Sequence, residues 1–429
     1  MKTLTLLCMV LWSAGALTAQ DSLSLADAIA TALDNNYDIQ ITAGDEKVAE
    51  IRNAWGTAGR FPSLDVSGGA TWLWNYNDQQ DFERQRLEGG VSLNWLLFDG
   101  FGISIRKDRL ELFEELSDGN TTVVIEETIQ SVILAYYKIL LEREKLDVAK
   151  TLMELSQDRY DYESERQQLG SMTTYEVLQA KNSWLEDEGR FLLQEVAYKN
   201  SIRDLNFLMA EDPQATWEFT EAFQVDPQQY DLASLEEKML ANNKNLKNQY
   251  INQRLLDKEV ALQRAAWWPT LSASASYSNS ESELTYTGLD PVTSNEYSYV
   301  GSLNLRWSLF DGGNRKRAVK VAKVDRETGR IQLENMRHAL VNQLYNFYEI
   351  HLVRQELLTV AEEALETAEL NLQISEEKFR AGAINSFNYR DVQLLYLNSA
   401  VNRLDAIYSY IDVDTALLRI IGGIISEYE

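Results

Sequence analysis

The stretch NWLLFDGF, residues 94–101, is echoed much later by RWSLFDGG, residues 306–313. The offset between the two Leu-Phe-Asp-Gly copies recurs almost unchanged elsewhere along the chain. It relates FPSL at 61–64 to WPTL at 268–271, Asn35-Asn36 to Asn242-Asn243, and Gly170 to Gly382. Self-similarity at a fixed offset predicts two structural repeats of about 190 residues each.

Proline is missing from two long tracts of the chain, residues 101–211 and 313–429. Because proline breaks helix interiors, and because apolar residues recur there at steps of three and four, each tract predicts two long helices packed as in a coiled coil. Gly170 and Gly382 lie at matching points and predict the turns between these helices. Gly119 and Gly329 weaken the first long helix of each tract and predict a kink there.

Polarity alternates residue by residue ahead of each Leu-Phe-Asp-Gly copy. The alternation runs over 64–76 and 91–97, and again over 271–278 and 299–309. A period of two predicts strands with one apolar and one polar face, forming two β-hairpins. The polar faces are rich in serine, and tryptophan and tyrosine gather near the strand ends, as in the aromatic girdles of membrane barrels. We therefore expect the apolar faces to contact lipid; the alternative is two ordinary hairpins packed against the helices.

Four strands per chain are too few to close a barrel around a channel. An open sheet edge cannot face lipid, because unpaired backbone groups there cost several kcal/mol each. If the strands cross a membrane, several chains must therefore pool them. On this interpretation each Phe-Asp-Gly marks the exit from a strand into a helix, where Asp99 and Asp311 cap the helix and Gly100 and Gly312 allow the tight turn.

Composition argues against several classes of function. The net charge of −26 argues against binding to nucleic acid, which needs a basic face. We expect residues 1–19 to be a signal peptide, because Lys2 precedes an uncharged apolar run and small residues precede Gln20. The single cysteine, Cys8, lies within it, so neither disulfides nor an acyl anchor is expected. The sequence has no nucleophile motif, phosphate loop or metal-ligand set, so we predict no catalysis, no cofactor and no metal site.

With these features together, the sequence resembles the TolC-like outer-membrane efflux proteins, also called outer membrane factors. The resemblance covers nearly all of residues 22–421. It implies a membrane α+β fold in which each chain of a homotrimer gives four strands to a 12-stranded β-barrel, continued by a long periplasmic α-helical barrel. The motifs that carry the resemblance are the doubled LFDG, the FPSL and WPTL pair, LADAIATALDNN at 25–36, and the tips LGSMTTYEVLQA and AGAINSFNYRDV.

The resemblance also implies a place and a function. The place is the outer membrane of a Gram-negative bacterium, with lipid around the barrel. The function is that of a passive exit duct in a tripartite efflux or type I secretion system, opened at its periplasmic tips when a periplasmic adaptor protein and an inner-membrane pump dock. The alternative is a periplasmic coiled-coil adaptor or scaffold without a membrane barrel.

The predicted tips lie near Gly170, which ends one long helix, and near Gly382. After the first of these turns, Thr173 and Glu176 predict a capping box for the next helix. By resemblance, Asp391 matches an aspartate that lines the entrance as a three-fold ring, whereas Asn388 replaces a second one. Ile384 stands where TolC has a gating arginine, so an aromatic constriction is expected in place of an ion-pair latch. The predicted channel-entrance residues are Asp391, Asn388, Glu176, Phe379 and Tyr175. The predicted adaptor contacts are Leu169, Gly170, Ser171, Met172, Ala381, Gly382, Ala383 and Ile384.

These expectations give an order of domains along the chain. Each repeat should contain a helix, a β-hairpin and then a long helical hairpin. The predicted domains are the signal peptide at 1–19, a first repeat at 20–211 with hairpins 63–98 and 101–211, an equatorial linker at 212–231, a second repeat at 232–421 with hairpins 270–310 and 313–421, and a tail at 422–429.

Overall fold

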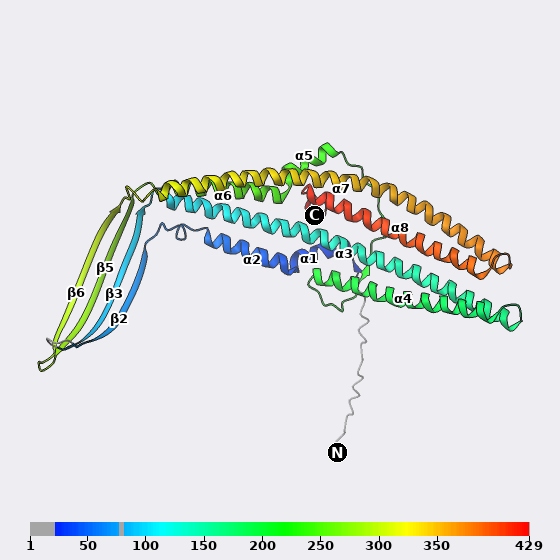
Figure 1. The fold of residues 1–429 in the computed structure, drawn as a ribbon, viewed down its shortest axis with the longest axis horizontal. Helices are drawn as coiled ribbons and strands as arrows, with labels where there is room; N and C mark the ends of the chain where they lie inside the picture. Colours follow the sequence, from blue (N-terminus) through cyan, green and yellow to red (C-terminus); the bar gives the residue numbers. More distant parts are fainter. Residues whose placement is uncertain (1–21, 77–80, 429) are drawn as a thin grey trace, which may run out of the picture.

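The molecule is elongated, with a β-sheet at one end and long helices running away from it (Figure 1). The structure, a computed structural model, describes residues 22–76 and 81–428. The expected signal peptide, residues 1–19, lies outside the described residues. The turns between the long helices lie at the end of the molecule farthest from the sheet (Figure 1).

Two halves of the chain are built from matching elements. The long helices of the halves are equal in length, 67 residues for α3 and α7 and 35 residues for α4 and α8. The two-repeat organisation expected from the sequence is therefore confirmed. The first half contains β1 (Ser22–Leu23), α1 (Leu25–Asn35), α2 (Tyr37–Arg52), β2 (Ser63–Asn75), β3 (Phe82–Phe98), α3 (Gly102–Gln168), α4 (Thr174–Leu208) and β4 (Glu218–Phe219). The second half contains α5 (Leu232–Asn242), α6 (Lys244–Ala265), β5 (Thr270–Tyr286), β6 (Val292–Arg306), α7 (Asn314–Arg380), α8 (Ser386–Ile420) and α9 (Ile424–Tyr428).

The two hairpins join into one antiparallel sheet in the order β2-β3-β5-β6. Directly paired residues share a face, and Leu64 pairs with Leu93, which pairs with Ala275. Apolar side chains therefore gather on one face of the sheet. On this face Trp72 and Leu303 are 55% and 66% exposed, so it does not pack against the chain's own helices. That excludes the ordinary hairpins packed on helices.

Near the helices, β3 departs from simple alternation. The pairing with β5 shifts between Leu96 and Phe98, so that Phe98 lies opposite Leu271. One extra residue on one strand is the signature of a β-bulge, which turns the following side chain to the other face. Phe98 therefore joins the apolar face in place of Leu97, which the alternation alone had assigned to it.

The second hairpin ends earlier than predicted. β6 stops at Arg306, which pairs with Thr270, whereas the sequence predicted strand through Leu309. The residue before Thr270 is Pro269, which has no N–H to donate to a strand ladder. The pairing therefore stops there, and the prediction for residues 307–309 is wrong.

The Phe-Asp-Gly turns connect the sheet to α3 and α7 much as expected, but from a different cap position. Gly100 has a φ of +69°, which glycine adopts without strain. Asp99 lies two residues ahead of the cap position, and its Oδ1 accepts the N–H of Ile103 at 3.0 Å. In the second copy Asp311 accepts the N–H of Arg315 at 2.8 Å. Both aspartates therefore satisfy a first-turn N–H that would otherwise be unpaired.

α3 and α7 each continue as a helix without a break through Gly119 and Gly329, where the sequence predicted a kink. Both glycines instead mark a close approach of α6. A β-carbon on Gly119 would lie 2.0 Å from Oδ1 of Asn248, and one on Gly329 would lie 2.3 Å from Cδ1 of Leu256. Only glycine leaves room for α6 between the two long helices.

The repeated Asn-Asn pairs form two equivalent helix joints. Asn36 accepts the N–H of Asp38 at 2.9 Å, which caps α2, and its amide donates to the carbonyl of Leu208 at the end of α4, also at 2.9 Å. In the second half Asn243 caps α6 and donates to the carbonyl of Ile420 at the end of α8 at 2.9 Å. One side chain thus connects the last turn of a long helix to the first turn of a short one.

The apolar core lies midway along the helices, at a level we call the equator. Here α1, the ends of α4 and α8, and α9 surround the stretch of α3 from Ile129 to Leu141, which holds the longest series of buried apolar residues in that helix. Tyr136 is wholly buried in it and donates its hydroxyl to the carbonyl of Leu23 at 2.9 Å. In the described residues, no helix has an apolar stretch long enough to cross a membrane.

We expect Asn243→Ala to lower the melting temperature of the detergent-solubilised protein by several degrees. The substitution removes a helix cap and leaves the carbonyl of Ile420 buried without its donor, a combined cost of about 1–3 kcal/mol. Asn242→Ala, at the exposed neighbour, is the matched control and should change stability little. Equal shifts for the two variants would contradict the joint. Differential scanning fluorimetry is a sufficient measurement.

Candidate channel entrance at the helical tips

Both long helical hairpins turn through the same backbone motif. At the end of α3, Gly170 has a φ of +75°, and the N–H of Ser171 donates to the carbonyl of Arg166 at 3.0 Å. At the end of α7, Gly382 has a φ of +74°, and the N–H of Ala383 donates to the carbonyl of Lys378 at 2.8 Å. This left-handed glycine turn satisfies carbonyls that the helix end leaves free.

The return helices begin at strong caps. Thr173 accepts the N–H of Glu176, and the Glu176 carboxylate accepts the N–H of Thr173 at 2.9 Å, so the predicted capping box is present. These hydrogen bonds from Thr173, its backbone N–H first, lower the pKa of Glu176. In the second tip Asn385 accepts the N–H of Asn388 at 2.9 Å. Glu176 is therefore charged and held in the cap.

The two tips lie side by side (Figure 1). The hydroxyl of Tyr162 on α3 donates to the carbonyl of Arg380 at the end of α7 at 3.2 Å. The rings of Tyr175 and Phe387, one from each return helix, are 6.5 Å apart. A single chain therefore brings both predicted tip segments to one place.

The predicted entrance residues differ in how far they project. Asp391 and Asn388 are exposed near the start of α8, and Tyr175 is 65% exposed. Phe379, by contrast, is buried: its ring stacks on Tyr389 at 4.8 Å. Phe379 therefore packs inside the tip and does not project from it. Of the two aromatic residues predicted to form a constriction, only Tyr175 projects from the tip.

The predicted adaptor contacts form a mostly exposed surface at the turns. Leu169 is 83% exposed and is the most exposed leucine of the described residues. The others divide into two groups. Gly170, Ser171, Ala381, Gly382 and Ala383 are exposed, whereas Met172 and Ile384 are partly buried.

Sequence reasoning missed a buried ion pair just behind the tips. Arg390 on α8 binds Asp187 on α4 through two hydrogen bonds of 2.6 and 2.8 Å. Asp187 is 1% exposed, and the pair joins the first helical hairpin to the second. Removing one partner of such a pair is strongly destabilising, because the other charge stays buried.

A second buried polar contact lies beside this pair. Ser386 at the start of α8 donates to Glu163 on α3, and Arg159 donates to the carbonyl of Ser386 at 3.4 Å. Arg159 and Glu163 are 3% and 0% exposed, and burial raises the pKa of Glu163 and lowers that of Arg159 to about 10. Arg159 therefore keeps its charge at neutral pH.

The sequence does contain a signal for these residues. The buried positions of α3 continue as Leu152, Ser156, Arg159 and Glu163, which are spaced by four, three and four residues. The helical stripe that carries apolar residues at the equator thus carries polar ones near the tip. A charged residue at a stripe position predicts a buried partner on the facing helix.

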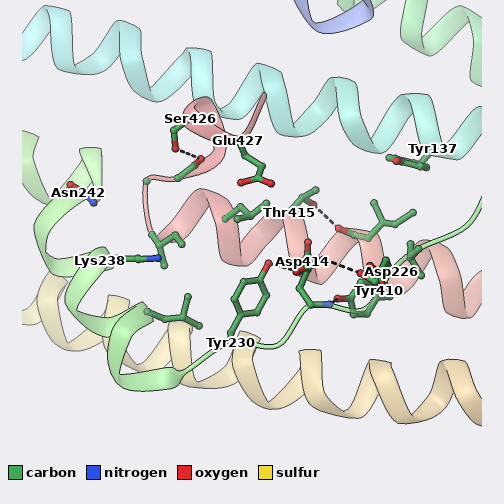
Figure 2. Close-up of a pocket in the computed structure, with 18 of the residues that line it drawn as sticks. Tyr137, Asp226, Tyr230, Lys238, Asn242, Tyr410, Asp414, Thr415, Ser426 and Glu427 are labelled. Atoms are coloured by element: carbon green, nitrogen blue, oxygen red, sulfur yellow. Dashed lines mark hydrogen bonds between the residues drawn. The ribbon is translucent and has the colours of Figure 1, made fainter. Parts of the chain in front are cut away.

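A cavity of about 610 Å³ lies at the equator, where the linker, α5, α8 and the C-terminal tail meet (Figure 2). The hydroxyl of Tyr230 donates to Oδ1 of Asp414 at 2.9 Å across its wall. Burial first, and then the Asp414 charge, raise the pKa of Tyr230. Asp226 and Glu427 add further carboxylates, against one ammonium from Lys238.

The two histidines of the sequence do not form a metal site with other residues. His351 is buried, and its Nε2 lies 3.3 Å from Oδ1 of Asp414 and 3.2 Å from the hydroxyl of Tyr410. His338 is exposed on α7. Within residues 22–76 and 81–428, no group of three or more histidine, cysteine or acidic side chains is placed to hold a metal ion.

A four-stranded sheet with an exposed apolar face, joined to long helices that end in capped tips, defines a class of channel proteins with strands in the outer membrane and helices in the periplasm. The chain belongs to the outer membrane efflux protein family, whose model matches residues 28–211 and 235–423. The family and the fold are those of channels. The expected fold class, a four-stranded contribution to a shared barrel continued by long helices, is confirmed.

Individual relatives are distant in sequence but similar over their length. The probable outer membrane lipoprotein SilC of Salmonella typhimurium is 19% identical over 411 residues, which cover 92% of this chain and 85% of SilC. The outer membrane channel CmeC of Campylobacter jejuni superposes with a TM-score of 0.76 at 15% identity, over 93% of this chain and 85% of CmeC. CusC superposes with a TM-score of 0.75 at 14% identity, over 93% and 92%. The chain is accordingly an outer membrane protein with a periplasmic helical extension.

We expect Asp187→Asn to loosen the tips while the equator stays intact. The substitution leaves the Arg390 guanidinium buried without its counter-charge, at a cost of about 3–5 kcal/mol. Hydrogen–deuterium exchange should rise in the tip segments of α3, α4 and α8 and stay unchanged around Tyr136. Lys199→Gln, which removes an exposed ion pair on the same helix, is the control.

A double variant separates charge burial from packing. Asp187→Leu with Arg390→Met replaces the pair by apolar side chains and should restore slow exchange at the tips, because apolar replacement of a buried ion pair is often neutral. If hydrogen–deuterium exchange at the tips of Asp187→Asn is as slow as in the unsubstituted protein, the ion pair does not hold the two hairpins together.

Proposed function

We propose that the protein is the outer-membrane exit duct of a tripartite efflux or type I secretion system, acting as a passive homotrimeric channel. One observation carries the proposal. The sheet has an exposed apolar face, and within the described residues its outer strands, β2 and β6, each have a neighbour on one side only. Such edges are unstable in lipid unless another chain pairs with them.

Three copies satisfy this requirement with twelve strands. The edge strand β6 of one copy would pair with β2 of the next, so that the interface is heterologous and closes into a ring. In a closed ring with four strands from each copy, no strand edge stays unpaired. The serine-rich face of the sheet then lines the water-filled interior. The long helices, continuing in the opposite direction from the sheet, would form the periplasmic part of the duct.

The tips are the proposed entrance and docking end. The periplasmic adaptor would contact the exposed turn residues, with Leu169 as the anchor, and the inner-membrane pump would supply cargo at this end. Opening would repack the tip helices, because the ion pairs, hydrogen bonds and aromatic ring contacts that join the hairpins there lie outside the apolar core at the equator. Arg390 and Asp187 would hold the hairpins together until docking. Residues 212–231 and 422–429 would form the equatorial region.

Asp391 is the proposed selectivity residue. It is exposed beside the tip, and three symmetry-related copies would place three carboxylates around the entrance. Asn388, one turn earlier, would add no second acidic ring, and Glu176 is held by its cap. The entrance would therefore favour cations through a single ring of charge.

The alternative function, a periplasmic scaffold, accounts for the helices but not for the sheet. It would leave the apolar face that includes Trp72 and Leu303 in water, where an exposed apolar surface of this kind promotes aggregation. No contact in the described residues favours that function.

Purified protein should migrate as a trimer on unheated gels and conduct ions in planar bilayers. We expect Asp391→Asn to lower the cation-to-anion permeability ratio about twofold or more, because it removes three charges from the narrowest part. Reversal potentials in a salt gradient measure this ratio, and Asp405→Asn, an exposed acid farther along α8, is the control. A water-soluble monomer that conducts nothing would falsify the proposed function.

We also expect Leu169→Glu to abolish co-purification of the adaptor from the native host without lowering trimer yield. A charge at this exposed apolar position removes the proposed anchor and opposes its burial. Leu193→Glu is the control, because Leu193 is also highly exposed but lies on α4 away from the turn. Loss of the adaptor in both variants, or in neither, would contradict docking at the tip.

A further inference from the structure

The apolar face of the sheet does not extend to the ends of its strands. Alternate residues share this face, so its composition can be followed strand by strand from the helical end outward. On β6 it carries Leu305, Leu303 and Gly301, and then Tyr299 and Tyr297. Beyond the second tyrosine the same face becomes polar, with Asn295 and Thr293.

The neighbouring strands show the same transition. On β5 the face carries Leu271, Ala273, Ala275 and Tyr277, and then polar residues from Asn279 onward. On β3 it is apolar from Trp95 to Leu87 and polar at Gln85 and Glu83. The residues past the transition include three carboxylates on the outward side: Glu83, Glu281 and Glu283.

The transition runs obliquely across β2, β3 and β5, whereas on β6 the apolar face extends one residue pair farther than on β5, because Tyr297 pairs with Asn279. On β2 the apolar face continues through Trp72 to Trp74, which pairs with Glu83, whereas on β5 it has already ended at Asn279. Strands of a barrel are tilted by about 35–45° from its axis. A plane perpendicular to the axis therefore meets successive strands at shifted positions, and the oblique boundary is the trace of such a plane.

The width of the apolar band fits a bilayer. Leu305 to Tyr297 spans nine residues on β6, which at about 3.3 Å each, with tilt, gives a height of roughly 20–25 Å. That is about the height of the lipid-facing band of an outer-membrane barrel. The band begins at the helical end of the strands and ends in tyrosine and tryptophan. The rest of the sheet has no further apolar band.

We propose that the bilayer covers only the part of the sheet nearest the helices, and that the outer parts of β3, β5 and β6 stand clear of it. In this arrangement acyl chains contact the band from Leu305 to Tyr297 and its counterparts on the other strands. The outward-facing residues of 82–86, 279–286 and 292–296 form a polar collar in water on the cell-surface side. The inference rests on the proposed function, because it takes the apolar face as the outer face of a closed barrel.

Single cysteines test the depth of each position, since the only native cysteine is Cys8. Two pairs of adjacent residues give an outward and an inward position at each level. Leu303→Cys faces outward in the band and Ser302→Cys faces the interior beside it. Glu283→Cys faces outward in the collar and Ser282→Cys faces the interior beside it. Intact cells are treated with a charged maleimide that does not cross membranes, with the parent chain as background.

We expect Glu283→Cys, Ser282→Cys and Ser302→Cys to react at similar rates. Leu303→Cys should react at least about tenfold more slowly, because hydrocarbon excludes a charged reagent. All four should react fully after denaturation, which confirms that the variants are present, and unheated gels show whether each variant assembles.

The outcomes separate the collar from the channel. If Glu283→Cys is as slow as Leu303→Cys while Ser302→Cys stays fast, lipid reaches the outer sheet and the collar is overturned, but the barrel stands. If Leu303→Cys reacts as fast as Ser302→Cys in assembled protein, the apolar face is not in lipid and the proposed function itself fails.

Discussion

A strand edge that faces hydrocarbon must be paired, and most of this structure depends on that constraint. The four strands of one chain leave β2 and β6 each with a single neighbour. Other copies of the chain are the natural source of the missing partner strands, so the pairing of the sheet is complete only in an assembly of several copies. The bulge at Phe98, the glycine turn after Asp99 and the end of β6 beside Pro269 then fix where the sheet gives way to helices.

The helical part divides its stabilising contacts by position along the axis. Apolar burial is concentrated at the equator, around Tyr136, where the short helices and the linker add to the long ones. Toward the tips the same helical stripe carries Arg159 and Glu163, and ion pairs and hydrogen bonds join the hairpins there beside aromatic ring contacts. Polar contacts can be exchanged for contacts with a docking protein more readily than a buried apolar core can be opened, which suits the opening proposed for the tips.

Much of this architecture could be predicted from the sequence, because it depends on sequence patterns that recur at a regular spacing. The repeat offset, the lack of proline and the alternation of strands predicted the two halves, the long helices and the sheet. Other features depend on contacts between distant segments, which no local pattern reports. Gly119 resembled a helix breaker but accommodates Asn248 of α6, and Arg390 meets Asp187, more than two hundred residues away. Phe379 looked free to line a channel, yet Tyr389 covers it.

The glycines that admit α6 have a geometric consequence. The circumference of a ring of rods equals the sum of the distances between neighbouring axes, so each close contact sets the bore of the whole ring. Gly119 and Gly329 shorten two of these distances in every subunit, because any larger residue would meet Asn248 or Leu256. Alanine at either position would require the facing side chain to change its rotamer or α6 to move, and any such movement would be repeated in every subunit around the ring. The lack of a side chain at these two positions in each subunit thus allows neighbouring helices to approach closely, and that approach contributes to the diameter of the channel.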